Sequence, residues 1–243
     1  FRSLLPRLAA LGQAEEKRLS KSDGYEQIDK FKRNLELFKY ELINTEVKFN
    51  KFFKKLRARK EFAFDTETAN FDPVNAELLG ISFSWQAGEA YYINFQFSLL
   101  ESGQAIFNFQ LKNADLFNYQ EKKSEERVNR GWLDKLKPIM EDEKIKKYGH
   151  NIKYDIEVMA SLGIKVSGVA ADSMVASYLL DSGSRQHGLD AVTRKEFNHQ
   201  KITKEDLLGK GKEKISFGQV AAEKLFNYSC EDADFTNRLV KKF

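Results

Sequence analysis

Apolar and polar residues follow two different periods along the chain, and each change of period marks a structural element. Short apolar runs at 40–44, 61–66, 78–85 and 90–95 predict β-strands. The last two runs are separated by the turn-forming residues 86–89, which predicts a β-hairpin. Adjacent strands of this kind are sufficient to form a sheet.

Apolar residues at helical spacing occupy most of the rest of the chain. Residues 46–58 place one group of apolar side chains on one side of an amphipathic helix, namely Val47, Phe49, Phe52, Phe53 and Leu56. In the second half, one short strand is predicted at 145–149, and helices are predicted at 130–142, 151–164, 172–183, 189–197 and about 217–242. This order of strands and helices predicts an α/β fold in which helices cover a mixed sheet.

Two segments follow neither period. Residues 1–38 begin with an apolar patch and continue as a charged, loop-like stretch, so we interpret them as a linker or inter-domain segment that precedes a globular domain at 39–243. Residues 98–128 mix aromatic with amide and charged residues, which predicts a surface insertion. Its aromatic residues have a second interpretation, because Phe107, Phe109, Phe117 and Tyr119 are of the kind that stacks on nucleic-acid bases.

Composition narrows the class of protein. A length of 243 residues with 42% hydrophobic content is enough for a substantial core without disulfides. A single cysteine, Cys230, and the lack of a long apolar run lead us to expect a protein of the reducing cytoplasm with no membrane association. We also expect a monomer. The net charge of +4 permits a polyanionic partner, and 207–217 reads as a basic surface loop. None of the three histidines has zinc-ligand spacing.

The apolar run at 61–66 carries two acids, Asp65 and Glu67, at its C-terminal end. Residues i and i+2 of a strand share a face, so the two carboxylates point the same way and repel each other. A divalent cation turns this repulsion into ligation, because hard cations such as Mg²⁺ and Mn²⁺ take oxygen ligands. The same acid-x-acid spacing occurs within 141–143 and 232–234, so the pair alone does not establish a site.

Two later helices carry further candidates. Asn151 and Asp155 lie four residues apart near the start of one helix and therefore share a face. Tyr228 and Asp232 have the same spacing on the last helix. Taken alone, Asp155 is more typical of a solvated helix acid, and Tyr228 is more typical of a tyrosine at the edge of the core. A two-metal phosphoryl-transfer site needs several acids from distant segments, so the combination favours a metal-dependent site.

Together these stretches resemble the three motifs of the DEDD exonuclease superfamily in its tyrosine-containing branch. The surrounding sequence narrows the resemblance to the 3'-to-5' proofreading exonuclease domain of bacterial-type DNA polymerase I, over residues 40–243. The stretches that carry it, in the order of that family, are FAFDTET, ELLGISFS, DSMVASYLL, HGLDAV, ITKEDLLGKGKEKISFGQVA and YSCEDADFT.

The resemblance implies a ribonuclease-H-like fold and hydrolysis of the terminal phosphodiester of single-stranded DNA, with release of deoxynucleoside 5'-monophosphates. It implies two divalent cations, Mg²⁺ or Mn²⁺. Asp65, Glu67 and Asp232 would hold one of them, and Asp65 with Asp155 would hold the second, directly or through water. Tyr228 and Glu67 would orient the attacking water.

The resemblance also implies partners. Four residues correspond to family positions near the DNA strand, namely Thr68, Phe71, Asn151 and His187, although His187 is equally compatible with packing beneath the site. The partners implied are a single-stranded DNA 3' end, the monophosphate product and a covalently linked polymerase domain, in a nucleoid-associated cytoplasmic protein. Three alternatives stay open: a ribonuclease-D-like exoribonuclease, a non-catalytic single-strand-binding spacer, and a docking domain that works through 98–128.

Overall fold

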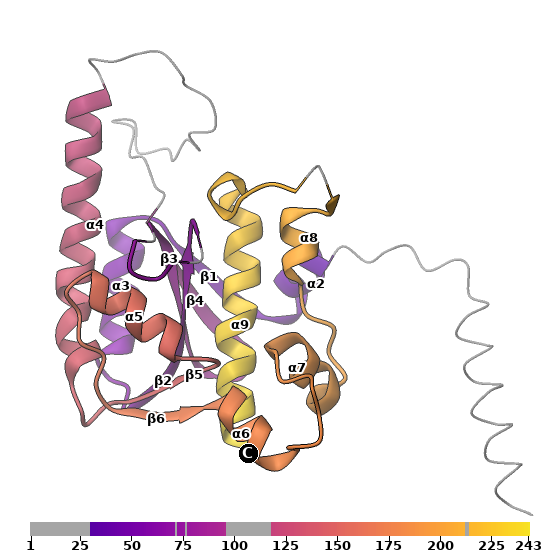
Figure 1. Cartoon of the computed structure of the whole chain (residues 1–243). Coiled ribbons are helices and arrows are strands. Elements are labelled where there is room, and N and C mark those ends of the chain that lie inside the picture. The colour runs from indigo at the N-terminus through magenta and orange to yellow at the C-terminus, as the bar shows by residue number, and fades with distance from the viewer. Residues whose placement is uncertain (1–29, 71, 76, 96–117, 212–213) are drawn as a thin grey trace, which may run out of the picture.

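The structure is a computed structural model that describes residues 30–70, 72–75, 77–95, 118–211 and 214–243. A mixed six-stranded β-sheet lies at the centre of this part of the chain (Figure 1). The order across the sheet is β1-β4-β3-β2-β5-β6. The central strands β2, β3 and β4 pair antiparallel, and the other pairs are parallel. The strands are β1 (Lys39–Ile43), β2 (Glu61–Thr68), β3 (Leu78–Gln86), β4 (Glu89–Asn94), β5 (Lys146–Gly149) and β6 (Val169–Asp172).

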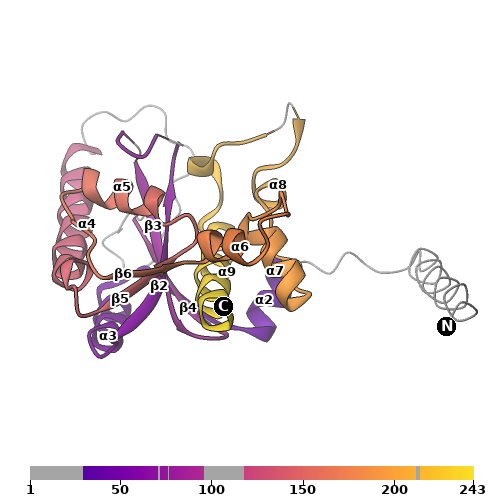
Figure 2. The same ribbon diagram turned by 60° about the horizontal axis from the view of Figure 1, so that its bottom comes forward.

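Helices cover both faces of the sheet, which confirms the predicted architecture (Figures 1 and 2). One side carries α3 (Glu46–Leu56), α4 (Asn118–Glu141) and α5 (Lys153–Ser161). The other side carries the long α9 (Ala222–Lys242), with α2 (Lys30–Leu37), α7 (Leu189–Phe197) and α8 (Lys204–Leu208) around it. The remaining elements are α6 (Ser173–Leu180) and the 3₁₀ helix η2 (Phe217–Gln219).

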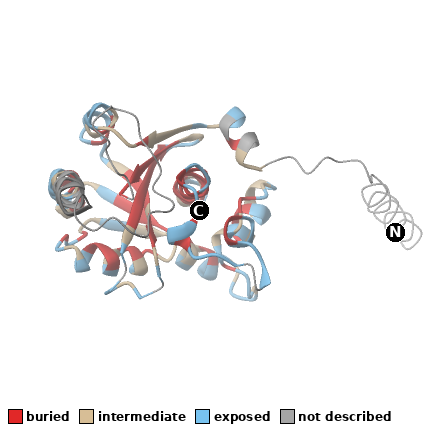
Figure 3. Ribbon diagram, turned by 90° about the horizontal axis from the view of Figure 1, so that it is seen from above, coloured by how far each residue is buried: buried red, intermediate tan, exposed pale blue. Residues whose placement is uncertain are grey.

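Two apolar cores lie between these layers, and Figure 3 shows both the central strands and α9 as buried. The helix expected after the first strand is α3, whose start is capped by the Thr45 side chain at 3.3 Å from the Lys48 amide. It buries Phe49, Phe52 and Leu56, whereas Val47, expected on the same face, is exposed. The predicted hairpin is confirmed, since β3 and β4 pair up to Gln86 and Glu89 around a turn.

The central strand β2 presents different side chains to the two helical layers, because successive residues of a strand point to opposite faces. Phe62 and Phe64 belong to the core beneath α3, α4 and α5. Thr66 follows on that side, so Asp65 and Glu67 point to the side of α9. The register with β3 shifts between Glu67 and Thr68, which ends the regular strand at this place.

Residues 30–37 form α2, although the sequence pattern predicted a loop-like linker there. Asn34 is fully buried, and Phe31 packs against the core on the α9 side. Lys30 Nζ donates a hydrogen bond to Asp206 Oδ2 at 2.6 Å. Tertiary packing therefore stabilises a helix that the charged sequence did not suggest. Residues 1–29 lie outside the described part, so the proposed domain boundary at residue 38 stays a prediction.

The helix α4 begins at Asn118, well before the predicted start at 130, so the end of the expected insertion is helical. Residues 96–117, with Phe107, Phe109 and Phe117, lie outside the described residues, and their stacking stays a prediction. The short β6 and α8 were not expected. Each has only four or five residues, at least half of them exposed, and so carries no clear hydrophobic period. No helix in the described ranges has the length and apolar character needed to cross a bilayer.

Candidate active site

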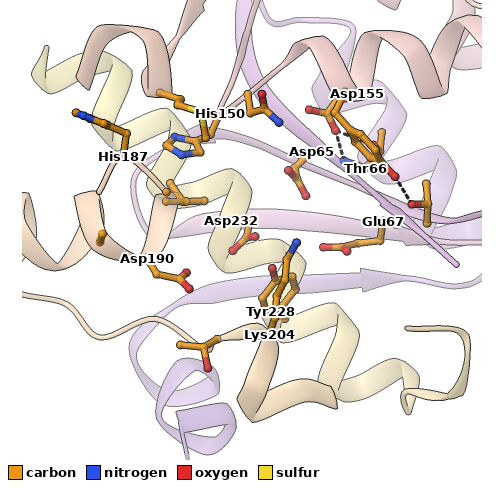
Figure 4. A pocket seen from close by; sticks show the side chains of 18 of the residues that line it. Asp65, Thr66, Glu67, His150, Asp155, His187, Asp190, Lys204, Tyr228 and Asp232 are labelled. Atoms are coloured by element: carbon orange, nitrogen blue, oxygen red, sulfur yellow. Dashed lines mark hydrogen bonds between the residues drawn. The ribbon is translucent and has the colours of Figure 1, made fainter. Parts of the chain in front are cut away.

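Asp65 and Glu67 of β2 meet Asp232 of α9 at the edge of the sheet where β2 ends (Figure 4). One carboxylate oxygen from each residue lies within 4.8 Å of the other two. Glu67 and Asp232 are buried, and Asp65 is half-buried. Three carboxylates at this separation have the donor type and the spacing that a divalent metal ion takes as ligands.

The fourth acid, Asp155, reaches the same place from the opposite side of the sheet, since it lies in the first turn of α5. Its Oδ1 accepts hydrogen bonds from the Thr66 amide at 2.8 Å and from the Thr66 hydroxyl at 2.6 Å. Thr66 stands between Asp65 and Glu67 in the sequence and faces the other layer. The structure therefore brings Asp155 next to the acids of β2, with one oxygen fixed by the strand.

The start of α5 is held by an acid from a neighbouring element. Asp172 accepts hydrogen bonds from the backbone amides of Asn151 and Ile152, both at 3.0 Å, and also caps α6 through the Met174 amide at 2.8 Å. Asn151 has a φ of 63°, a left-handed conformation that asparagine tolerates better than most residues. One carboxylate thus fixes the beginnings of two helices, and with them the position of Asp155.

The four acids depart from ordinary carboxyl behaviour. Burial raises the pKa of Asp65, and Asp155, Glu67 and Asp232 raise it further by repulsion. Burial and the repulsion of Asp232 raise the pKa of Glu67 to about 8. Burial likewise raises the pKa of Asp155 to about 7 and that of Asp232 to about 6. When ionised, the four acids therefore carry more negative charge than the surrounding protein neutralises. Divalent cations would supply the missing positive charge, so these residues fit such ions.

Two further residues of α9 complete this side of the site. Ser229 donates a hydrogen bond to Glu67 Oε1 at 2.7 Å and so fixes the direction of that carboxylate. Tyr228 is buried beside Asp232 on the same face of the helix, and burial together with the neighbouring acids raises the pKa of its phenol well above the usual range. The Tyr228 hydroxyl consequently stays protonated and able to donate a hydrogen bond.

All four acids and Tyr228 line one pocket of about 780 Å³. The same pocket is lined by Thr68, Asn151 and His187, three of the residues expected to contact DNA. Phe71 lies outside the described residues. A cavity of this size is within the range of small-molecule sites and has room for a nucleotide.

Two of these expected DNA contacts already have protein partners. The Thr68 hydroxyl donates to the Asn70 carbonyl at 2.7 Å and lies 2.6 Å from the Tyr154 hydroxyl. His187 bonds the Ser177 hydroxyl through Nδ1 at 2.8 Å and the Ser184 carbonyl through Nε2 at 3.0 Å. These bonds favour a packing role for His187, and its contact with DNA stays a prediction.

Sequence reasoning missed four side chains that touch the acids or line the pocket with them, namely Thr66, Ser229, Lys201 and Lys204. Strand alternation places Thr66 on the face opposite to Asp65, and this signal would have revealed it. No comparable signal marks Lys201 and Lys204, because the segment that carries them reaches the site only through the fold. Lys204 and Tyr228 both line the pocket, and both are labelled in Figure 4.

Solved structures show which class of fold this is. Trypanosoma brucei RNase D aligns with a TM-score of 0.57 and 14% identity, over 84% of this chain and 65% of its own. Brucella melitensis NrnC aligns with a TM-score of 0.52 and 19% identity, over 84% of this chain and 79% of its own. The mixed sheet of this order therefore has a ribonuclease-H-like fold, as the resemblance implied.

Sequence comparison identifies the family. The family model for the 3'-5' exonuclease matches residues 40–243. DNA polymerase I of Pseudomonas aeruginosa is 36% identical over 202 residues, which are 82% of this chain and 20% of that protein. DNA polymerase I of Chloroflexus aurantiacus is 34% identical over 190 residues, 77% of this chain and 17% of its own. The chain belongs to the 3'-5' exonuclease family. It is similar to the corresponding part of DNA polymerase I and spans about one fifth of these relatives' length.

Proposed function

We propose that this domain is a metal-dependent 3'-to-5' exodeoxyribonuclease that shortens single-stranded DNA and releases deoxynucleoside 5'-monophosphates, as the proofreading part of a DNA polymerase I. The observation that carries the proposal is the convergence of Asp65, Glu67, Asp155 and Asp232, from three separate elements, on one pocket. Structural acids rarely gather in this way, because each added charge raises the free energy of the others.

The acids provide a binding site for two divalent cations, Mg²⁺ or Mn²⁺. Asp65, Glu67 and Asp232 would hold one ion, and Asp65 with the Asp155 oxygen not bonded to Thr66 would hold the other. Such ions lower the pKa of a bound water and stabilise the leaving oxygen. The protein's own task is positioning. Ser229 fixes the carboxylate of Glu67, so that Glu67 and the protonated Tyr228 orient the attacking water by hydrogen bonds.

The DNA substrate is supported by the relatives, which are DNA polymerases I, and the linked polymerase domain is proposed on the same ground. RNA is the second candidate, because the fold is shared with Trypanosoma brucei RNase D. Both substrates present the same terminal phosphodiester to the same acids, so the choice between them depends on contacts to the sugar.

The test is digestion of a DNA strand labelled at its 5' end and of the matched RNA strand, resolved on a gel, with Mg²⁺, with Mn²⁺ and with EDTA. The variant is Asp155→Ala, and the matched control is Asp134→Ala, an exposed acid on α4 whose ion pair with Arg130 is long and solvated. We expect a metal-dependent ladder that shortens from the 3' end of DNA, absent in Asp155→Ala and retained in the control.

Faster shortening of the RNA strand would contradict the DNA proposal and favour the ribonuclease-D-like alternative. A folded domain that leaves both strands intact with either metal would contradict catalysis by this domain and favour a non-catalytic spacer. Equal activity of the parent and of Asp155→Ala would place the reaction elsewhere.

A further inference from the structure

A lysine is completely buried beside the acid cluster. Lys201 lies in the segment between α7 and α8, and its side chain has no exposed surface. A buried ammonium group is costly unless it is paired, because it loses its hydration. Its Nζ contacts Asp232 Oδ1 and lies 3.6 Å from Asp190 Oδ1 and 3.9 Å from Glu231 Oε2.

Among these partners, Asp232 is the one that Lys201 holds directly. Glu231 is already bonded by His199 Nε2 at 2.7 Å and by the Ile202 amide at 2.6 Å, and its distance from Lys201 exceeds that of a hydrogen bond. Asp190 is half exposed, so solvent weakens its attraction for the ammonium group. The ammonium therefore pairs chiefly with an acid of the proposed metal site and takes one of its two oxygens.

Lys201 also lies over the ring of Tyr228, with Nζ 5.1 Å from the ring centroid, within the range of a cation–π contact. Tyr228 and Asp232 are one helical turn apart on α9. A single ammonium thus contacts both the acid and the tyrosine that α9 directs toward the pocket.

The contact between Lys201 and Asp232 changes the net charge of the site. The four acids carry four negative charges when ionised, and the repulsion among them opposes their close approach. A lysine is an ammonium ion at neutral pH, and here the contact with Asp232 and the nearby Asp190 and Glu231 carboxylates surround it with negative charge. The ammonium therefore neutralises part of the cluster without any metal, and it repels a cation that shares Asp232.

We propose that Lys201 is a positioning residue of the metal site, an internal counter-cation that keeps the four acids together when metal is absent, reserves one oxygen of Asp232 and thereby weakens the binding of the divalent ion. The consequence is a site that folds before it is loaded and binds its metal less tightly than the acids alone would. This inference rests on the proposed metal-dependent function.

The experiment compares the parent chain with Lys201→Met, which removes the charge and keeps an unbranched side chain. The first measurement is the thermal midpoint in EDTA and at increasing Mn²⁺, and the second is the Mn²⁺ dissociation constant by calorimetry. Two controls remove a lysine charge elsewhere. Lys204→Met does so at an exposed lysine that lines the pocket, and Lys195→Met does so at an exposed ion pair with Asp181.

We expect Lys201→Met to lower the midpoint in EDTA, to enlarge the rise of the midpoint on addition of Mn²⁺, and to bind Mn²⁺ at least about tenfold more tightly, because a nearby positive charge has been removed. Lys204→Met should change the Mn²⁺ dissociation constant less, since water screens an exposed charge. Lys195→Met should leave the constant unchanged.

A Lys201→Met variant that is unfolded in EDTA but folds with Mn²⁺ would support the proposal, because the ion then replaces the ammonium. An equal loss of midpoint with and without Mn²⁺, an unchanged or weaker Mn²⁺ affinity, or a variant unfolded under both conditions would overturn it and leave Lys201 a purely structural residue. A parent chain that does not respond to Mn²⁺ at all would instead contradict the metal site itself, and this inference with it.

Discussion

Asp232 and Asp234 lie two residues apart on α9 and are both buried, yet their surroundings are opposite. Asp234 is fully hydrogen-bonded by the protein. It accepts bonds from Arg238 Nε at 2.9 Å and Nη2 at 2.8 Å, from the Gly88 amide at 2.8 Å and from the Tyr40 hydroxyl at 3.0 Å. These contacts tie α9 to the β3-β4 turn and to β1.

Asp232 instead faces the pocket, because residues i and i+2 of a helix point in different directions. Its only charged partner of opposite sign that contacts it in the described part is Lys201, and Asp65 and Glu67 lie close to it. Burial raises the pKa of Asp232 to about 6. The difference shows that burial alone does not identify a functional acid. A functional acid is identified by burial next to other acids, with too few hydrogen-bond donors to satisfy its carboxylate.

The largest expected effect follows from removing the acid that faces the pocket. Asp232→Asn should reduce exonuclease turnover by more than about 100-fold. Loss of a residue that only hydrogen-bonds a metal ligand costs up to about 100-fold, and here a proposed ligand itself is lost. The repulsion that Asp232 exerts on Asp65 and Glu67 is also lost, and this offsets part of the lost pairing with Lys201, so the thermal midpoint in EDTA should fall less than in Asp234→Asn. Gel-resolved digestion at matched concentrations of folded protein measures this, and turnover near that of the parent would contradict it.

The matched change two residues further on should affect stability instead. Asp234→Asn leaves Arg238 without its ion pair and should lower the free energy of unfolding by about 3 kcal/mol, near the lower end for breaking a buried pair, because Arg238 is partly exposed. Chemical denaturation measures that change. Activity per folded molecule should remain. Loss of turnover without loss of stability would erase the distinction between the two acids.

The sequence was enough to predict that the pocket acids lie together, but not that Asp234 has a structural role. The apolar run before Asp65 and the strand period were enough to place two acids on one face, and the helical spacing of Tyr228 and Asp232 was enough to place that pair. The same acid-x-acid pattern at 232–234 could not be divided into a pocket residue and a structural one. That division depends on Arg238, on the β3-β4 turn and on Lys201, which only the fold brings together.

A third prediction concerns pH. The pKa values of Glu67, Asp155 and Asp232 are raised to about 8, 7 and 6, above the unfolded values near 4, so the folded chain binds more protons than the unfolded chain between these limits. Stability of the metal-free domain should therefore fall as pH rises from about 4 to 8, on the order of a few kcal/mol.

Thermal midpoints in EDTA across this pH range test the sign. Glu67→Gln, which removes the acid with the highest of the three pKa values, is the control and should flatten the slope toward pH 8. A midpoint that rises with pH in the parent, or the same slope in both proteins, would show that burial and the neighbouring charges do not raise the pKa values of these acids in the folded chain.

The smallest expected effect comes from a donor that belongs to the pocket side of the comparison. Ser229→Ala removes the hydroxyl that bonds Glu67, and this bond lowers the pKa of that carboxyl, so the pKa of Glu67 should rise further. The change should cost about 1 kcal/mol of stability, typical of one hydrogen bond. Turnover should fall about tenfold, with the acidic limb of the pH-rate profile displaced to higher pH.

The control is Ser161→Ala, which removes a hydroxyl bonded to the Val158 carbonyl on α5 and should change neither the turnover nor the pH-rate profile. An unchanged pH profile in Ser229→Ala would mean that the Glu67 carboxylate needs no fixed hydrogen-bond donor. The number of hydrogen-bond donors would then not be the property that distinguishes the pocket acids from Asp234.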